Sequence, residues 1–167
     1  MRIVPPSKDD FRRTIGRFAT GVTIITTRQG HHLHGMTANA VTSVSLDPLL
    51  VLVCVDKTAD THDILLKAGV FAVNILSINQ QEISQKFATK NAEWTHGMEG
   101  VGYRAGATGS PIIEGCIAYL DCRTVTEQHG GDHTIFIGEV VEAAELSDGE
   151  PLLFYAGQFA ALRHVAQ

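Results

Sequence analysis

Residues 36–55 have the sequence MTANAVTSVSLDPLLVLVCV, and this stretch decides the fold class. Residues 36–45 are rich in threonine, serine, valine and alanine, and residues 49–55 form an apolar run. Asp47 and Pro48 lie between the two segments. A proline disfavours helix in the residue before it, so the chain is expected to turn there. We therefore predict two neighbouring β-strands joined by a short turn.

Strand signals continue on both sides of this stretch. Residues 22–27 and 70–76 are rich in β-branched or apolar side chains, which favour strands. Residues 117–125 and 134–141 alternate around Gly130-Gly131-Asp132, a pattern typical of a hairpin. Several strands at short spacing with few helices favour a closed antiparallel barrel, so we expect a mainly β fold with flanking helices.

The helix expected at the start of the chain is amphipathic. Ser7 can cap it, with Asp10 completing a variant of the capping box. Phe11, Ile15 and Phe18 fall on one face. We expect this face to pack across the sheet.

Two shorter helices are expected further along the chain. One begins at Asp60 or Thr61 and runs through Lys67, with Gly69 closing it. The other covers residues 79–88. Residues 89–110 are polar, rich in glycine and without periodicity, so we expect a long loop over a binding site.

Composition limits the classes of function. The chain has 167 residues, which predicts one domain over residues 1–167. Its net charge of −5 and scattered basic residues argue against nucleic acid as a partner. The N-terminal residues lack the apolar core of a secretory signal, and no apolar run approaches the ~20 residues that span a membrane. We expect a soluble cytoplasmic protein.

The three cysteines, Cys54, Cys116 and Cys122, form no C-x-x-C pair and are expected to be reduced thiols. His31, His32 and His34 cluster in a polar connection, but no thiol or carboxylate completes a metal site nearby in the sequence. We interpret them as a surface loop and expect no metal. Residues 100–105 match the loose dinucleotide pattern G-x-G-x-x-A, but no strand precedes them and Gly106, Gly109 and Pro111 forbid the required helix, so we reject a Rossmann site there. Walker, nucleophile-elbow and zinc-helix motifs are absent.

Three segments can carry chemistry, and each has two interpretations. The hydroxyls and the amide in residues 37–45 either face water along a strand or bind a ligand. Residues 56–62 either form a solvated helix start or hold a phosphate with Lys57 and main-chain N–H groups. His133 either lies in a surface turn or faces a cleft.

Several segments, in their order along the chain, together resemble the flavin reductase family with the FMN-binding split-barrel fold, over about residues 11–162. The matching segments are FATGVT (18–23), GMTAN (35–39), SVSLDPL (43–49), KTADT (57–61), FAVNIL (71–76), GDH (131–133) with Gly138, and PLLFY (151–155). The fold that this resemblance implies is an antiparallel Greek-key split β-barrel.

The resemblance also implies the residues of a flavin pocket and of a nicotinamide-nucleotide site. Flavin contacts are expected from Thr37, Ala38, Asn39, Ala40, Ser43, Val44, Ser45, Cys54, Val55, Asp56, Lys57, Thr61 and Phe87. Nucleotide contacts are expected from His133, Tyr155 and Phe159. The segment YAGQF (155–159) lacks an arginine that the family often has there.

The activity implied is reduction of FMN or FAD by NADH or NADPH, with reduced flavin passed to a separate oxygenase component. Hydride passes directly between the two rings, so no catalytic acid or base is expected. The family also implies a homodimer. Two alternatives share the fold: a non-catalytic FMN-binding electron carrier, and an oxidase of the pyridoxamine-phosphate type. The GDH histidine argues against the first, and the lack of an arginine cluster argues against the second.

Overall fold

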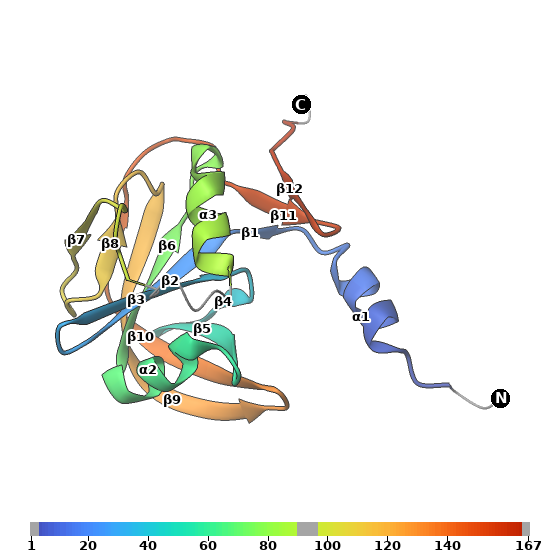
Figure 1. Ribbon diagram of the computed structural model, residues 1–167, viewed down its shortest axis with the longest axis horizontal. Coiled ribbons are helices and arrows are strands. Elements are labelled where there is room, and N and C mark those ends of the chain that lie inside the picture. The colour runs from blue at the N-terminus through green and yellow to red at the C-terminus, as the bar shows by residue number, and fades with distance from the viewer. Residues whose placement is uncertain (1–3, 90–96, 165–167) are drawn as a thin grey trace.

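The computed structural model describes residues 4–89 and 97–164, and Figure 1 shows their arrangement. Seven antiparallel strands form the main sheet. Their order across the sheet is β3 (His32–Ala38), β2 (Thr23–Gln29), β6 (Val70–Ile75), β9 (Ala118–Gly130), β10 (His133–Glu145), β5 (Leu49–Asp56) and β4 (Val41–Leu46). Non-sequential neighbours such as β2 and β6 give the order expected of a Greek-key arrangement. The prediction of a mainly β, antiparallel fold is confirmed.

The two edge strands, β3 and β4, are consecutive in the chain. Only Asn39 and Ala40 separate them, so the sheet must curl until its two edges meet at this link. The main-chain N–H of Cys54 donates to the Ala40 carbonyl at 3.0 Å, which fastens the link to β5. No ladder joins β3 to β4 in the described residues, so the sheet is split along this line. The single strand expected over residues 36–45 is therefore two strands.

Strand alternation separates the core from the outer surface. Val51, Val53 and Val55 of β5 point inward and pack with Phe71 and Phe136. The residues between them are only partly buried and lie on the outer face of the sheet. This outer face of β5 becomes part of the candidate site.

The two internal helices follow the sequence prediction closely. α2 spans Asp60–Ala68 and ends at Gly69, whose left-handed conformation (φ 65°) is favourable for glycine. A 3-10 turn, η1 (Ile78–Gln80), leads into α3 (Gln81–Ala88). No helix in the described residues is long and apolar enough to cross a membrane.

The N-terminal helix α1 (Lys8–Ile15) has the predicted capping box, because Ser7 and Asp10 exchange hydrogen bonds. The prediction that it packs across the sheet is wrong. α1 stands away from the main sheet (Figure 1) and has no buried residue. Phe11, Ile15 and Phe18 remain 62%, 54% and 73% exposed. The amphipathic pattern of a helix predicts that its apolar face is covered, but it does not identify the surface that covers it.

A second, three-stranded sheet connects α1 to the main sheet. It contains β1 (Thr20–Gly21), β11 (Leu153–Tyr155) and β12 (Gln158–Ala160), in the order β1-β11-β12. The main-chain N–H of Ala156 donates to the carbonyl of Gly16 at 2.8 Å. This bond ties the end of α1 to the β11–β12 turn.

The expected loop over residues 89–110 is more ordered than predicted, although residues 90–96 lie outside the described part. β7 (Tyr103–Ala105) pairs with β8 (Pro111–Ile113). The connection between them is held by Asp121, a fully buried carboxylate. It accepts hydrogen bonds from the Thr108 N–H at 2.7 Å and the Thr108 hydroxyl at 2.6 Å. Such long-range contacts leave no periodicity in the sequence.

Candidate functional site

A cleft lies where the two edges of the main sheet meet the small sheet and α1. It consists of three adjoining cavities of about 650, 640 and 190 Å³, all lined by Asn39. The two larger cavities also share Phe18, Thr20, Val41 and Thr42. We call the three together the cleft.

Eight of the residues expected to contact flavin or nucleotide line this cleft: Thr37, Ala38, Asn39, Ala40, Ser43, Ser45, Cys54 and Phe159. They come from β3, β4, β5 and β12, segments that are far apart in the sequence. The split in the sheet brings them together.

The link between β3 and β4 offers free hydrogen-bond donors. Asn39 and Ala40 are exposed, and neither main-chain N–H has a partner within the described chain, nor does the Asn39 side-chain amide. The neighbouring groups are already engaged: the Thr37 hydroxyl donates to the Ser84 carbonyl at 2.6 Å, and the Ala38 carbonyl accepts from Thr23 at 2.6 Å. The link is held at Ala38 by Thr23 and at the Ala40 carbonyl by the N–H of Cys54, so its donors are presented in a fixed position.

A β-bulge shapes the β4 side of the cleft. The register between β4 and β5 shifts between Ser43 and Ser45, leaving Val44 unpaired and 46% exposed. Ser43 and Ser45 line one cavity, whereas Val44 does not. The Ser45 hydroxyl accepts a hydrogen bond from the Asp47 N–H at 3.2 Å.

The outer face of β5 continues from the cleft to His133. Cys54 lines the cleft and pairs with Ile135 of β10. Asp56, two residues further along β5, pairs with His133. At the rise of an extended strand, this separation is about 7 Å. We call Cys54, Asp56, His133 and Ile135 the outer strip.

His133 lies at the first position of β10, with its side chain 41% exposed. Its Nδ1 is 2.8 Å from the Asp132 carboxylate. This hydrogen bond to His133 lowers the pKa of Asp132 below its usual range. His133 does not line the cleft itself, but the outer strip joins the two.

Lys57 is already committed to the same turn. Its ammonium donates to the Gly131 carbonyl at 2.6 Å, and its main-chain N–H donates to the Asp132 carbonyl at 3.0 Å. Its role in the structure described is to fasten the end of β5 to the β9–β10 turn.

The remaining expected residues lie elsewhere. The side chains of Val55, Thr61 and Phe87 are buried, at 0%, 2% and 4% exposure. None of these three residues lines the cleft. Tyr155 lies at the β11–β12 turn, where Arg17 donates to its hydroxyl at 3.3 Å.

Two threonines of the cleft, Thr20 and Thr42, were not among the expected ligand contacts, although Thr42 belongs to the polar segment 37–45. Thr20 lines both larger cavities, and its hydroxyl oxygen is buried without a hydrogen-bond partner in the described residues. Thr42 lines both cavities and is exposed. Thr20 belongs to the segment FATGVT that carries the family resemblance, but a lone threonine gives no local signal of a site.

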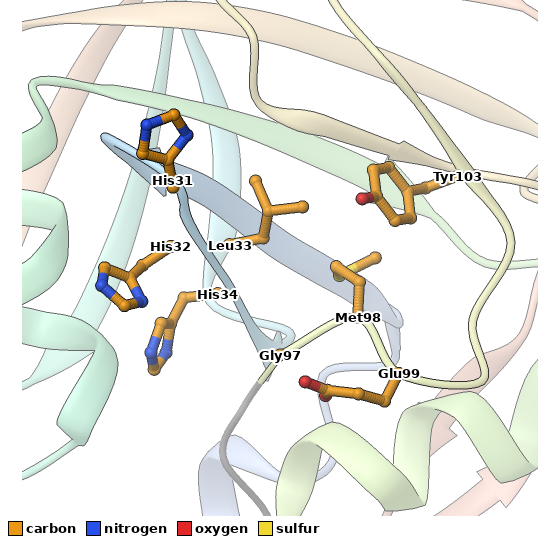
Figure 2. A pocket seen from close by; sticks show the side chains of 8 residues that line it. All are labelled: His31, His32, Leu33, His34, Gly97, Met98, Glu99 and Tyr103. Carbon is orange, nitrogen blue, oxygen red and sulfur yellow. The ribbon is translucent and has the colours of Figure 1, made fainter.

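The histidine cluster forms a separate hollow of about 540 Å³. Figure 2 shows His31, His32 and His34 along the β2–β3 turn and the start of β3, with Glu99 on the facing segment. A carboxylate is therefore near the cluster, which the sequence spacing did not reveal. Even so, no group of three or more His, Cys, Asp or Glu side chains suited to a metal ion occurs in the described residues.

The prediction that residues 89–110 cover the site is not met by the described part of that segment. Gly97, Met98, Glu99 and Tyr103 line the histidine hollow, and none of residues 97–110 lines the cleft. Residues 90–96 lie outside the described residues.

Fold and cleft together define a class: a mainly antiparallel β protein with a partly apolar cleft where a curled sheet splits. The model of the flavin reductase like domain matches residues 15–163. The chain belongs to this family.

Curated relatives and solved structures agree with this assignment. The chain is 36% identical to the reductase subunit HsaB of a flavin-dependent monooxygenase from Rhodococcus jostii, covering 89% of this chain and 75% of that one. It is 37% identical to the NADH-dependent FMN reductase AsuE2 from Streptomyces nodosus, covering 95% and 86%. The structure of the NADH:FAD oxidoreductase SgcE6 from Streptomyces globisporus superposes with a TM-score of 0.90 at 39% identity, covering 99% of each chain.

Proposed function

We propose that this protein is an NADH-dependent flavin reductase that supplies reduced FMN or FAD to a separate oxygenase component. The observation that carries the proposal is the cleft at the β3–β4 link, with the outer strip leading from it to His133. Membership of the flavin reductase family supports it. NADH rather than NADPH is proposed because the similar AsuE2 and SgcE6 are described as using NADH.

The residues of the cleft fit a flavin. A flavin ring has apolar faces and a polar edge, and the cleft combines apolar walls, including Phe18, Leu52 and Phe154, with free donors at Asn39 and Ala40. The unpartnered hydroxyl of Thr20 is a further polar group that a ligand can satisfy. We place the ring at the β3–β4 link, with Asn39 and Ala40 donating to its polar edge.

When bound, the flavin supplies the redox chemistry, because it accepts a hydride directly from a nicotinamide ring. The chain then has to orient the two ligands and exclude competing reactions. The main-chain N–H groups of Asn39 and Ala40 are positioned to stabilise negative charge that develops on the ring edge. His133 binds and orients the nucleotide at the other end of the outer strip.

A homodimer is part of the proposal. The exposed apolar residues of α1 continue through Phe18 to Leu46 and Leu49, which are 86% and 51% exposed. Phe18, Leu46 and Leu49 line the same cavity. We propose that a second copy of the chain covers this surface and closes the open side of the cleft, because large exposed apolar patches mark interfaces.

A cytoplasmic location and a separate oxygenase complete the proposal. The three cysteines in the structure are unpaired, which suits a reducing compartment. The relative HsaB is described as the reductase subunit of a flavin-dependent monooxygenase. We propose that this chain is likewise the reductase component and that a separate protein is the oxygenase.

Flavin titration tests the placement of the ring. Asn39→Leu removes a polar donor from the cleft and should weaken flavin binding by about tenfold, the factor for one well-placed hydrogen bond. Asn79→Leu, at an exposed position of η1, is the control and should bind as the wild type does. Wild-type affinity in Asn39→Leu, measured by quenching of flavin fluorescence, would remove Asn39 from the pocket.

A further inference from the structure

The residues on both sides of His133 are held by residues 57–62, the segment that follows β5 and begins α2. Lys57 bonds to the carbonyls of Gly131 and Asp132. On the other side of His133, the Thr134 hydroxyl lies 2.8 Å from Nε2 of His62, which belongs to α2. Residues 57–62 therefore form hydrogen bonds with the chain immediately before and after His133.

His62 is fixed in one orientation. It is only 8% exposed, and its ring meets that of Phe136 edge-on at a centroid distance of 5.9 Å. Its Nδ1 lies 3.0 Å from the Asp63 carboxylate, which in its ionised form can only accept. In the neutral imidazole Nδ1 therefore carries the proton, and Nε2 accepts the hydrogen bond from the Thr134 hydroxyl.

Thr134 transmits this constraint to its neighbour. It is 6% exposed and points into the barrel, whereas His133, one residue earlier, points outward. His133 is the first residue of β10 and follows Gly131, whose positive φ of 71° marks a tight turn. At this end of the strand, His133 pairs with Asp56 of β5 and with Gly130 of β9. The side-chain bond of Thr134 adds a contact with α2 next to His133, at the point where the ladders end.

We propose that His62 is a positioning residue for the nicotinamide nucleotide: by accepting the hydrogen bond of Thr134, it holds His133 at the outer strip. His62 touches neither the nucleotide nor the flavin. The inference rests on the proposed function, because it requires His133 to bind the nucleotide.

Two single substitutions break the bond from opposite sides. Thr134→Val keeps the shape and removes the hydroxyl; His62→Phe keeps a ring against Phe136 and removes the acceptor. Each should raise the KM for NADH about fivefold, as expected for one neutral hydrogen bond, with kcat and flavin affinity near wild type. The double variant should be no worse than either single one, because both remove the same bond.

Two controls separate positioning from general destabilisation. Thr134→Ser keeps the hydroxyl and should restore the wild-type KM. Thr27→Val removes another buried hydroxyl: Thr27, in β2, donates to the carbonyl of Val70, in β6, at 2.6 Å. This variant should have a lower Tm and an unchanged KM for NADH.

The outcomes distinguish this inference from the proposed function. The first outcome is that His133→Ala raises the KM for NADH, whereas Thr134→Val and His62→Phe leave it at the wild-type value. That result would overturn the role of His62 and leave the nucleotide site at His133 standing. An equal rise in Thr27→Val would also overturn the role of His62, because stability would then explain the effect. A wild-type KM in His133→Ala would overturn both this inference and the nucleotide site.

Discussion

His133 and Asn39 stand at the two ends of the candidate site and have different tasks. Asn39 presents unpaired donors in the cleft, whereas His133 lies about 7 Å further along the strand direction than the Cys54–Ile135 pair. Substitutions at the two positions should therefore separate flavin binding from nucleotide binding.

His133→Ala should raise the KM for NADH by about tenfold, because it removes a polar side chain from the nucleotide site, with flavin affinity unchanged. Steady-state kinetics with NADH varied at saturating flavin measure this. His129→Ala, an exposed histidine in the same hairpin, is the matched control. Equal kinetics in the two variants would show that His133 does not bind nucleotide.

The thiols provide a test of the cleft that does not depend on activity. Burial raises the pKa of Cys116 to about 11 and that of Cys122 to about 12, so both should resist thiol reagents until the protein unfolds. Cys54 is partly exposed, and burial raises its pKa as well, so it should react slowly.

Bound flavin should protect Cys54. Because Cys54 lines the cleft, its modification at about pH 8 should slow at least about tenfold when flavin is well above its Kd. Disulfide exchange with a chromogenic reagent gives the rate. Modification at the same rate with and without flavin would place the ring elsewhere.

Some residue placements could be predicted from the sequence and others could not. The TAN segment and the GDH turn were assigned to the two ends of the candidate site through the family resemblance, because each has a bland interpretation when it is taken alone. The run LLVLVCV does not show which residues face outward, because a continuous apolar strand lacks the alternation that separates its two faces. The inward direction of Val55 and the outward direction of Cys54 became clear only from the fold.

At the scale of elements, local signals predicted α2, α3 and the β9–β10 hairpin, because caps and turn glycines act over a few residues. They did not predict the break at Asn39 and Ala40, where strand-compatible residues bend because two edges of a curled sheet must be joined. Nor did they predict β7, which pairs with β8 across a connection held by Asp121.

The position of α1 leads to a prediction about assembly. Replacing Phe11 and Ile15 by glutamine removes the apolar face that no part of the described chain covers. The dissociation constant of the proposed homodimer should rise at least about tenfold, because buried aromatic and aliphatic side chains dominate interfaces. Sedimentation velocity measures the change.

Val125→Gln is the control for this experiment, since Val125 is 50% exposed on β9 and not on α1. It should leave the assembly unchanged. A monomeric wild-type protein, or a double α1 variant that remains dimeric, would contradict the role of α1.

At the scale of the whole molecule, the cleft exists because the sheet is not closed by a ladder. The edge strands β3 and β4 meet only through Asn39 and Ala40, and unpaired strand edges offer main-chain donors and acceptors. Here those groups lie beside the cleft. The same split that opens the barrel therefore provides the candidate binding site, and α1 extends the apolar surface next to it.

The central claim is that this chain reduces flavin with NADH, and anaerobic mixing tests it most directly. Purified protein is mixed with FMN or FAD and NADH without oxygen, and the visible absorbance of the oxidised flavin is followed. The account predicts rapid loss of that absorbance with at least one of the two flavins, at a rate proportional to protein concentration. Flavin that binds but keeps its absorbance after NADH is added would contradict the account and identify the protein as a flavin carrier.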